Sequence, residues 1–174
     1  MTSIKEQPID NREPGGHITD RIVDFLSSIG LTVVRSELNE PTRLPGLHVQ
    51  NGTVFIDQSK LQYPGDLLHE AGHLAVISAE KREQINGDFG DDMGMETAAM
   101  AWSYAAAVHL GITPEIVFHD GGYFGWSKAF VENFQGGRYV GVPILVWLDM
   151  TGDPNPRRER TLPAFPEMTK WLCD

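Results

Sequence analysis

The sequence predicts an α+β fold, with a small three-stranded, mostly antiparallel sheet beside a pair of helices. Residues 94–110 are rich in Ala, the best helix former, and residues 65–76 carry the Leu and Ala side chains of a packed helix. Residues 47–50 and 53–56 are strand-like segments on either side of Asn-Gly, the strongest sequence signal for a two-residue hairpin. A sheet layered beside helices makes the fold α+β.

The N-terminal part of the chain predicts one further helix and one further strand. Residues 1–16 are polar and contain Pro and Gly, so we expect this tail to be poorly ordered. A helix is predicted over residues 19–29 from its apolar stripe, with Thr19 as N-cap and Gly30 as the stop. Residues 31–35 are rich in β-branched side chains and predict the third strand of the sheet.

The helix predicted over residues 65–76 contains the sequence His69-Glu70-Ala71-Gly72-His73. Side chains four residues apart on a helix project about 40° apart around its axis, so both imidazoles can reach one metal ion. Glu70 lies about 100° from His69, beside the open side of the metal, where a carboxylate can take a proton from water. We therefore expect His69 and His73 to be metal ligands and Glu70 to be the catalytic base. The alternative is a helix with two surface or capping histidines.

Two histidines leave a catalytic zinc site short of one ligand, because such sites usually have three protein ligands and a water molecule. Glu96 is the only acidic residue in the helix predicted over residues 94–110, which Gly111 ends. Burying an unpaired carboxylate is costly, and coordination of a metal removes that cost. We expect Glu96 to be the third ligand; the alternative is a favourable interaction with the helix dipole. His109 is turned about 220° from Glu96 and cannot face the same ion.

Other residues compete with Glu96 for the third ligand position. His119 and Asp120, in a Gly-rich stretch, are the stronger rivals. Asp91 and Asp92 are weaker rivals, because loops between helices are usually solvated. A fourth protein ligand, such as His119 or Asp120, would instead indicate a purely structural metal.

The segment of residues 119–126 combines Gly with aromatic residues and predicts a shaped loop that forms a wall of the cleft. Such a loop could present His119 or Tyr123 to the substrate carbonyl, where a hydrogen-bond donor stabilises developing charge. The alternative is that its aromatic side chains fill the edge of the core. Ser103 lies seven residues after Glu96, on the same helix face, and is a candidate for the layer around the ligands.

The C-terminal part predicts short helices and an extended segment. Thr113 caps a short helix that has Pro at its first position, and residues 130–134 form another that ends at Gly136-Gly137. Residues 142–148 are an apolar run that we expect to be buried, without a periodicity that separates helix from strand. The prolines that follow Gly152 predict an extended segment draped over the domain.

Composition narrows the possible functions. The length of 174 residues suits one compact domain, expected over residues 17–174. The net charge of −10 argues against a nucleic-acid surface, and the short basic cluster at residues 157–160 is expected to be a solvated turn. The sequence contains no run of about eighteen apolar residues, so we expect no membrane span. Residues 1–8 lack the apolar centre of a secretory signal, and the single Cys173 fits a reducing, cytoplasmic location.

Four features of residues 45–107 together resemble a known family. They are Pro45-Gly46-Leu47, the strand-like residues 53–57, the motif segment 68–74, and Glu96-x-x-Ala99-x-x-Trp102. This combination is similar to the ImmA/IrrE family of small zinc-dependent peptidases, which commonly has Phe where this chain has Trp102. The resemblance implies a zincin-like domain of the gluzincin type, with one Zn²⁺ ion on His69, His73 and Glu96, and Glu70 as the base. Residues 117–174 match no part of that family.

The expected function is therefore zinc-dependent hydrolysis of peptide bonds, with Glu70 activating the water and a peptide or protein as substrate. An alternative is a metal-binding regulatory or interaction protein with a zincin fold and little or no turnover. Iron or manganese could bind the same three side chains. The sequence makes no prediction about oligomeric state or cleavage specificity.

Overall fold

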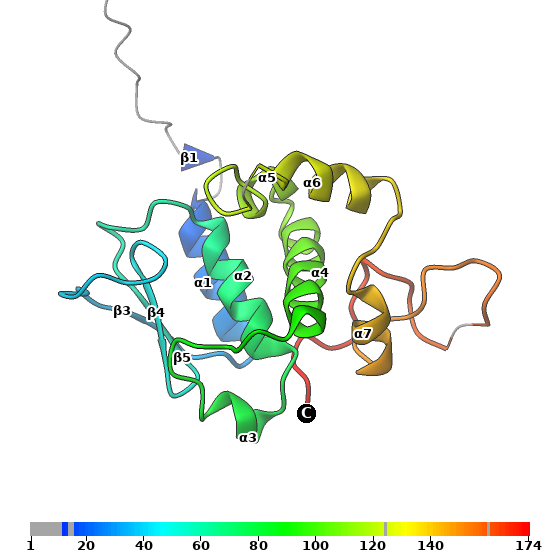
Figure 1. Ribbon diagram of the computed structural model, residues 1–174, viewed down its shortest axis with the longest axis horizontal. Coiled ribbons are helices and arrows are strands. Elements are labelled where there is room, and N and C mark those ends of the chain that lie inside the picture. The colour runs from blue at the N-terminus through cyan, green and yellow to red at the C-terminus, as the bar shows by residue number, and fades with distance from the viewer. Residues whose placement is uncertain (1–11, 14–15, 124, 160) are drawn as a thin grey trace, which may run out of the picture.

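The structure of the protein, a computed structural model, describes residues 12–13, 16–123, 125–159 and 161–174 (Figure 1). Its helices are α1 (Ile18–Ser28), α2 (Gly65–Ala75), α3 (Ala79–Arg82), α4 (Met93–Leu110), α5 (Pro114–Val117), α6 (Ser127–Gln135) and α7 (Val142–Trp147). Its strands are β1 (Arg12–Glu13), β2 (Gly16–His17), β3 (Val33–Arg35), β4 (Leu47–Gln50) and β5 (Thr53–Ile56). The expectation of a poorly ordered N-terminal tail falls mainly on residues 1–11 and 14–15, which lie outside the described residues.

The main sheet has three strands, in the order β3-β5-β4. β4 and β5 form the expected antiparallel hairpin, and Asn51 and Gly52 both adopt positive φ at its turn, with values of 49° and 71°. β3 pairs with β5 in the parallel direction, with Val33 opposite Val54. The sheet is therefore mixed, and the expectation of a mostly antiparallel sheet is corrected. The reason is that β3 occupies the free edge of β5, whereas pairing with β4 would have made it antiparallel.

One face of this sheet packs against helices. Leu47 and Val49 of β4 and Val54 and Ile56 of β5 are buried and alternate with more exposed residues, as expected for a strand with one covered face. α1 and α2 contact this sheet, α4 lies on the other side of α2, and α7 packs against α4 (Figure 1). The mixed α+β class that the sequence predicts is confirmed, and α2 and α4 lie side by side in its centre.

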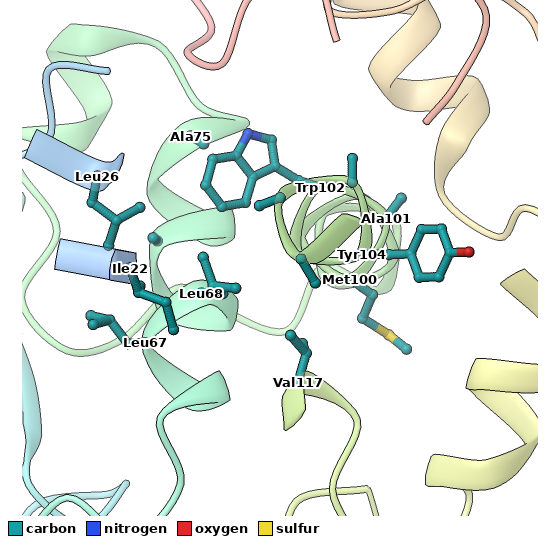
Figure 2. Close-up of a cluster of buried hydrophobic side chains, with 14 of the residues drawn as sticks. Ile22, Leu26, Leu67, Leu68, Ala75, Met100, Ala101, Trp102, Tyr104 and Val117 are labelled. Carbon is teal, nitrogen blue, oxygen red and sulfur yellow. The ribbon is translucent and has the colours of Figure 1, made fainter. Parts of the chain in front are cut away.

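α4 is the central helix of the core. Ten consecutive residues, Ala98–Ala107, are buried, because α4 is enclosed by α2, α5 and α7. Figure 2 shows Trp102 leaving α4 toward α2 and Tyr104 leaving it on the opposite side. The Trp102 indole is fully buried, and its Nε1–H donates to the Trp171 carbonyl at 2.9 Å. An Ala-rich helix that is apolar on all sides suits such a position.

Two local expectations need correction. The first helix begins at Ile18, so Thr19 lies inside it and is not the N-cap. Thr19 Oγ1 is buried and has no hydrogen-bond partner among the described residues. The apolar run at residues 142–148 is mostly the short helix α7, and it is not uniformly buried, because the Trp147 side chain is 80% exposed. Only the α7 side chains that face α4 belong to the core.

The C-terminal segment lies over the domain, as the prolines predict. Its backbone pairs through Thr151 with Met168 and through Gly152 with Ala164. Its last turn is tied to α2, because the Cys173 N–H donates to the Ala75 carbonyl at 2.8 Å. Arg157 and Arg158 are exposed, in agreement with a solvated turn. Within the described part of the chain, no helix combines the length and apolar character that crossing a lipid bilayer requires.

Candidate metal centre

Two neighbouring helices bring the three expected ligands together. His69 and His73 lie one turn apart on α2, and Glu96 lies in the first turn of α4. The ligand atoms of these three residues all lie within 4.8 Å of one another, and they are the one such cluster of His, Cys, Asp and Glu among the described residues. The expectation that Glu96 faces the two histidines is met by the geometry.

The two imidazoles lie close to each other, and each oxygen of the Glu96 carboxylate faces one of them. The two Nε2 atoms are 3.1 Å apart, His69 Nε2 is 3.4 Å from Glu96 Oε1, and His73 Nε2 is 3.1 Å from Glu96 Oε2. A tetrahedral ion with bonds of about 2.0–2.1 Å needs donors about 3.3–3.4 Å apart. Imidazole lone pairs and a carboxylate at such separations repel one another unless a cation or protons lie between them. The donor set therefore fits a small divalent cation.

The centre is open on one side. The imidazole side chains of His69 and His73 are 14% and 10% exposed, whereas that of Glu96 is 37% exposed. A cavity of about 340 Å³ reaches His69, Glu70 and Glu96. Its apolar lining includes Leu44, Met93, Met100, Trp126 and Phe130. A ligand entering this cavity would meet the carboxylates of Glu70 and Glu96 beside the imidazole of His69.

Glu70 and Glu96 occupy different electrostatic environments in this cavity. Burial raises the pKa of Glu70 to about 7, although the charges of His73 and Arg43 act in the opposite direction. Hydrogen bonds from His69 and His73 lower the pKa of Glu96. A carboxyl group with a raised pKa is suited to exchange protons near neutral pH, whereas one held ionised is suited to be a ligand.

The start of α4 places Glu96. Asp92 is the N-cap, and its Oδ1 accepts from the Gly94 and Met95 amides at 2.8 and 3.2 Å. The Glu96 amide donates to the Asp92 carbonyl at 2.9 Å. Asp92 is therefore a capping residue, and the sequence signal that was missed is an Asp shortly before the helix predicted from residue 94.

A close helix contact positions α4 against α2. A Cβ at Gly72 would lie 2.7 Å from the Ala99 carbonyl oxygen and 3.0 Å from Ser103 Oγ. Ser103 Oγ is itself 2.6 Å from the Ala99 oxygen and 3.2 Å from the Leu68 oxygen, so it joins the two helices. Ser103 makes no hydrogen bond to a ligand side chain, and its expected place around the ligands is corrected to a place between the helices.

The rival ligands lie elsewhere. His119 Nε2 is 2.7 Å from Asp66 Oδ1, and Asp120 accepts a hydrogen bond from Ser127. His109 lies in the last turn of α4, at the opposite end of the helix from Glu96, and packs against Phe25. None of these histidine or aspartate side chains belongs to the cluster, so the described residues provide three ligands and no fourth. A closed structural site with four ligands is not what these residues build.

Tyr123 reaches the centre from the loop between α5 and α6. Its Oη is 3.3 Å from His69 Nδ1, and its ring also lines the cavity. Burial and the neighbouring carboxylates raise the pKa of Tyr123, so the group stays a phenol. His119, by contrast, lines another cavity, of about 540 Å³, and does not line the one beside His69 and Glu96. Of the two loop residues considered for the substrate carbonyl, Tyr123 lines the cavity beside His69 and Glu96, and His119 does not.

Comparison with protein-family models, curated proteins and solved structures finds no match for this chain. Membership of the ImmA/IrrE family and a zincin-like architecture therefore stay predictions.

Proposed function

We propose that this protein is a zinc-dependent metallopeptidase, with His69, His73 and Glu96 as ligands and Glu70 as the base. The observation that carries the proposal is the cluster of two imidazoles and one carboxylate, with N···N and N···O distances of 3.1–3.4 Å, at an open cavity that Glu70 also lines. The choice of zinc is supported by the two imidazoles and one carboxylate, and by separations that suit tetrahedral bonds.

In the proposed reaction, the metal ion and the side chains of the protein have different roles. A bound Zn²⁺ ion would supply Lewis acidity, which polarises a carbonyl group and makes water acidic near neutral pH. Glu70 would accept the proton of the attacking water and then pass it to the departing amine. Its pKa of about 7 in this buried position suits both halves of that transfer. Glu96, held ionised, would offset part of the positive charge at the centre.

Three ligands favour catalysis over a structural role. A structural zinc ion is normally enclosed by four protein ligands, and a catalytic one keeps a position for solvent or substrate. The described residues offer three, and the 37% exposure of the Glu96 side chain leaves access from the cavity. A zincin-like fold is our inference from the pairing of α2 and α4 and from the resemblance of residues 45–107 to the ImmA/IrrE family.

A polypeptide substrate is supported by the cavity lining. Met93 and Trp126, at the edges of the cavity, are 72% and 66% exposed, and Met100 and Phe130 lie deeper. Exposed apolar side chains beside polar catalytic groups are typical of sites that bind an organic ligand. The net charge of −10 argues against a nucleic-acid substrate, and the single Cys173 suits work in the cytoplasm.

The first prediction is that Glu70→Gln strongly reduces hydrolysis without loss of metal. Cleavage of a fluorescently labelled, unstructured polypeptide by the zinc-loaded protein should fall about 10²–10⁴-fold, the usual contribution of a general base. Zinc content, measured by elemental analysis, should stay at one ion per chain. The matched control is Glu80→Gln, because Glu80 is exposed on α3 and lines none of the cavities described above.

Undiminished cleavage by Glu70→Gln would remove Glu70 from the mechanism. If the zinc-loaded wild-type chain binds one ion but cuts no polypeptide, the alternative of a metal-binding regulatory protein gains support. If elemental analysis of the purified protein finds iron or manganese in place of zinc, the reaction class must be reconsidered.

A further inference from the structure

The contact between Tyr123 and His69 bears on which nitrogen of the His69 ring carries the proton. When an imidazole binds a cation through Nε2, its remaining proton must lie on Nδ1. His69 Nδ1 is 3.3 Å from Tyr123 Oη, so a proton there has an acceptor. A neighbour that accepts from the second ring nitrogen selects the tautomer and the ring orientation of a metal-binding histidine.

The position of Tyr123 is set by its surroundings. Its ring contacts Phe130 edge-on at a centroid distance of 5.6 Å and Phe118 at 5.3 Å. The Trp126 amide donates to the Tyr123 carbonyl at 2.9 Å, which closes a turn after it. The phenol therefore approaches His69 from a packed segment.

A second contact ties the same loop to α2. His119 Nε2 lies 2.7 Å from Asp66 Oδ1 in the first turn of α2, and both side chains are about one-tenth exposed. The His119 ring stacks on Tyr63, with a centroid distance of 3.8 Å and an interplanar angle of 9°. A Cβ at Gly121 would lie 2.7 Å from Tyr63 Oη, so this loop sits directly on the aromatic pair.

The two contacts join the loop to one helix at two points. Asp66 and His69 are three residues apart on α2, and His119 and Tyr123 are four residues apart in the loop. Each α2 side chain meets one side chain of the loop. The pair of contacts therefore fixes the height of the loop along α2 at the level of the first ligand.

We propose that Tyr123 is a positioning residue for the metal ligand His69, held in place by the His119–Asp66 pair. In this role the phenol accepts from His69 Nδ1–H and leaves Nε2 free to bind the ion. The inference rests on the proposed function, because it assumes a metal at His69, His73 and Glu96. In this proposal the loop between α5 and α6 positions His69, and His119 does not need to contact the substrate.

The test compares zinc affinity in Tyr123→Phe and in the control Tyr104→Phe, by competition with a fluorescent chelator. Removing a partner of a metal ligand typically weakens metal binding about 10–100-fold, and we expect that loss for Tyr123→Phe. Tyr104 is also a buried tyrosine, but it projects from α4 away from α2, so Tyr104→Phe should bind zinc like the wild type (Figure 2).

A spectroscopic readout separates positioning from simple stability. In long-range ¹H–¹⁵N spectra of the zinc-loaded protein, the His69 Nδ1–H signal should be present in the wild type and exchange faster in Tyr123→Phe. Denaturant unfolding of the metal-free proteins should be similar for the two, since the ring is kept. Equal zinc affinity and an unchanged His69 signal in Tyr123→Phe would overturn the inference.

A double-mutant cycle tests the link through the loop. His119→Ala should weaken zinc binding in the wild type but have little further effect in Tyr123→Phe, because both changes remove one positioning contact. Independent, additive losses would contradict the link. If His119→Ala does not fold, Asp66→Asn takes its place in the cycle. A wild-type chain that binds no zinc would sink the proposed function itself, whereas equal binding by wild type and Tyr123→Phe sinks only this inference.

Discussion

Glu70 and Glu96 are two carboxylates at one centre whose surroundings separate their chemistry. Glu70 follows His69 on α2, and burial raises its pKa to about 7. Glu96 receives hydrogen bonds from both imidazoles, which lower its pKa. Two acidic side chains with opposite shifts at one site are the pattern expected when one moves protons and the other holds charge. The neighbours of each residue therefore decide which carboxyl group is suited to exchange protons and which is suited to stay ionised.

Asp57 does not belong to the candidate metal centre, but hydrogen bonds lower the pKa of its carboxyl group as they do for Glu96. Asp57 is buried after β5, and its carboxylate accepts from the Leu38 amide at 3.0 Å and from the Ser59 hydroxyl at 2.6 Å. These hydrogen bonds, with the amide of Leu38 foremost, lower the pKa of Asp57. Because the folded pKa lies below the unfolded one, this stabilisation is complete above the unfolded pKa and is lost as pH falls through the folded value.

At the residue scale we therefore predict that Asp57→Asn is less stable than the wild type near pH 7, and that the difference shrinks as the pH falls below about 4. Urea unfolding of both proteins between pH 3 and pH 7 measures this difference in free energy. Asp24→Asn is the control, since Asp24 is exposed on α1. A difference that stays constant over the whole range would show that the ionised Asp57 carboxylate is not the stabilising group.

At the scale of elements, the centre depends on how closely α2 and α4 approach. Gly72 lies inside the histidine motif and faces the Ala99 carbonyl of α4. Both histidines are on one helix, and Glu96 is on the other. Any change in the distance between the helices therefore changes the separation of Glu96 from the two imidazoles. Gly72 is a packing residue for the metal centre although it carries no side chain.

We predict that Gly72→Ala destabilises the protein and weakens zinc binding. Replacing Gly by Ala inside a helix gains about 1 kcal/mol of helix propensity. The new methyl group would lie 2.7 Å from a backbone oxygen, and overpacking of this kind costs about 1–3 kcal/mol. The clash involves backbone, so we expect it to exceed the propensity gain, by up to about 2 kcal/mol.

Denaturant unfolding and chelator competition measure the two effects of Gly72→Ala. Gly94→Ala, in the first turn of α4, is the comparison, because its Cβ would meet only the side chains of Asp92 and Ile144, at 3.1 and 3.5 Å. It should be less destabilising than Gly72→Ala. Wild-type zinc affinity in Gly72→Ala would show that the helix contact does not control the centre.

At the scale of the whole molecule, an ion bound by His69, His73 and Glu96 would act as a cross-link between α2 and α4. α2 packs on the sheet side and α4 packs against α5 and α7, so the two helices carry different parts of the structure (Figure 1). A ligand that binds only the folded state adds its binding free energy to stability. Metal content should therefore control the stability of the whole fold as well as the proposed hydrolysis.

We predict that zinc raises the melting temperature of the wild type and that a chelator reverses the rise. At a zinc concentration of about 100 times its dissociation constant the gain is about 2.7 kcal/mol, which corresponds to roughly 5–10 °C for a chain of this size. Thermal unfolding followed by circular dichroism measures this gain. Glu96→Ala, which removes the proposed ligand on α4, should show a much smaller response. A rise of equal size in Glu96→Ala would place the stabilising ion at another site.

Local sequence determined the parts of this protein that depend on neighbours along the chain. Asn51-Gly52 specified the hairpin because both residues tolerate positive φ, and the values of 49° and 71° agree. Gly111 ended α4 in the left-handed conformation, as a C-terminal glycine does. His69 and His73 share a face because a helix repeats every 3.6 residues. Periodicity and turn chemistry suffice for these features.

Tertiary structure decided what depends on contacts between distant segments. The parallel pairing of β3, the inclusion of Thr19 in α1 and the exposure of Trp147 all differ from local expectation. The meeting of Glu96 with the two histidines was expected, but its distances follow from the packing of α4 against Gly72.

The loop contacts to Asp66 and His69 join residues more than fifty positions apart. Backbone propensity acts over a few residues, whereas these contacts arise only when the core brings separate elements to the same place. The sequence by itself therefore determined which side chains are suited to bind a metal. The packing of the folded chain decided which of them meet, at what distance, and which neighbours hold them there.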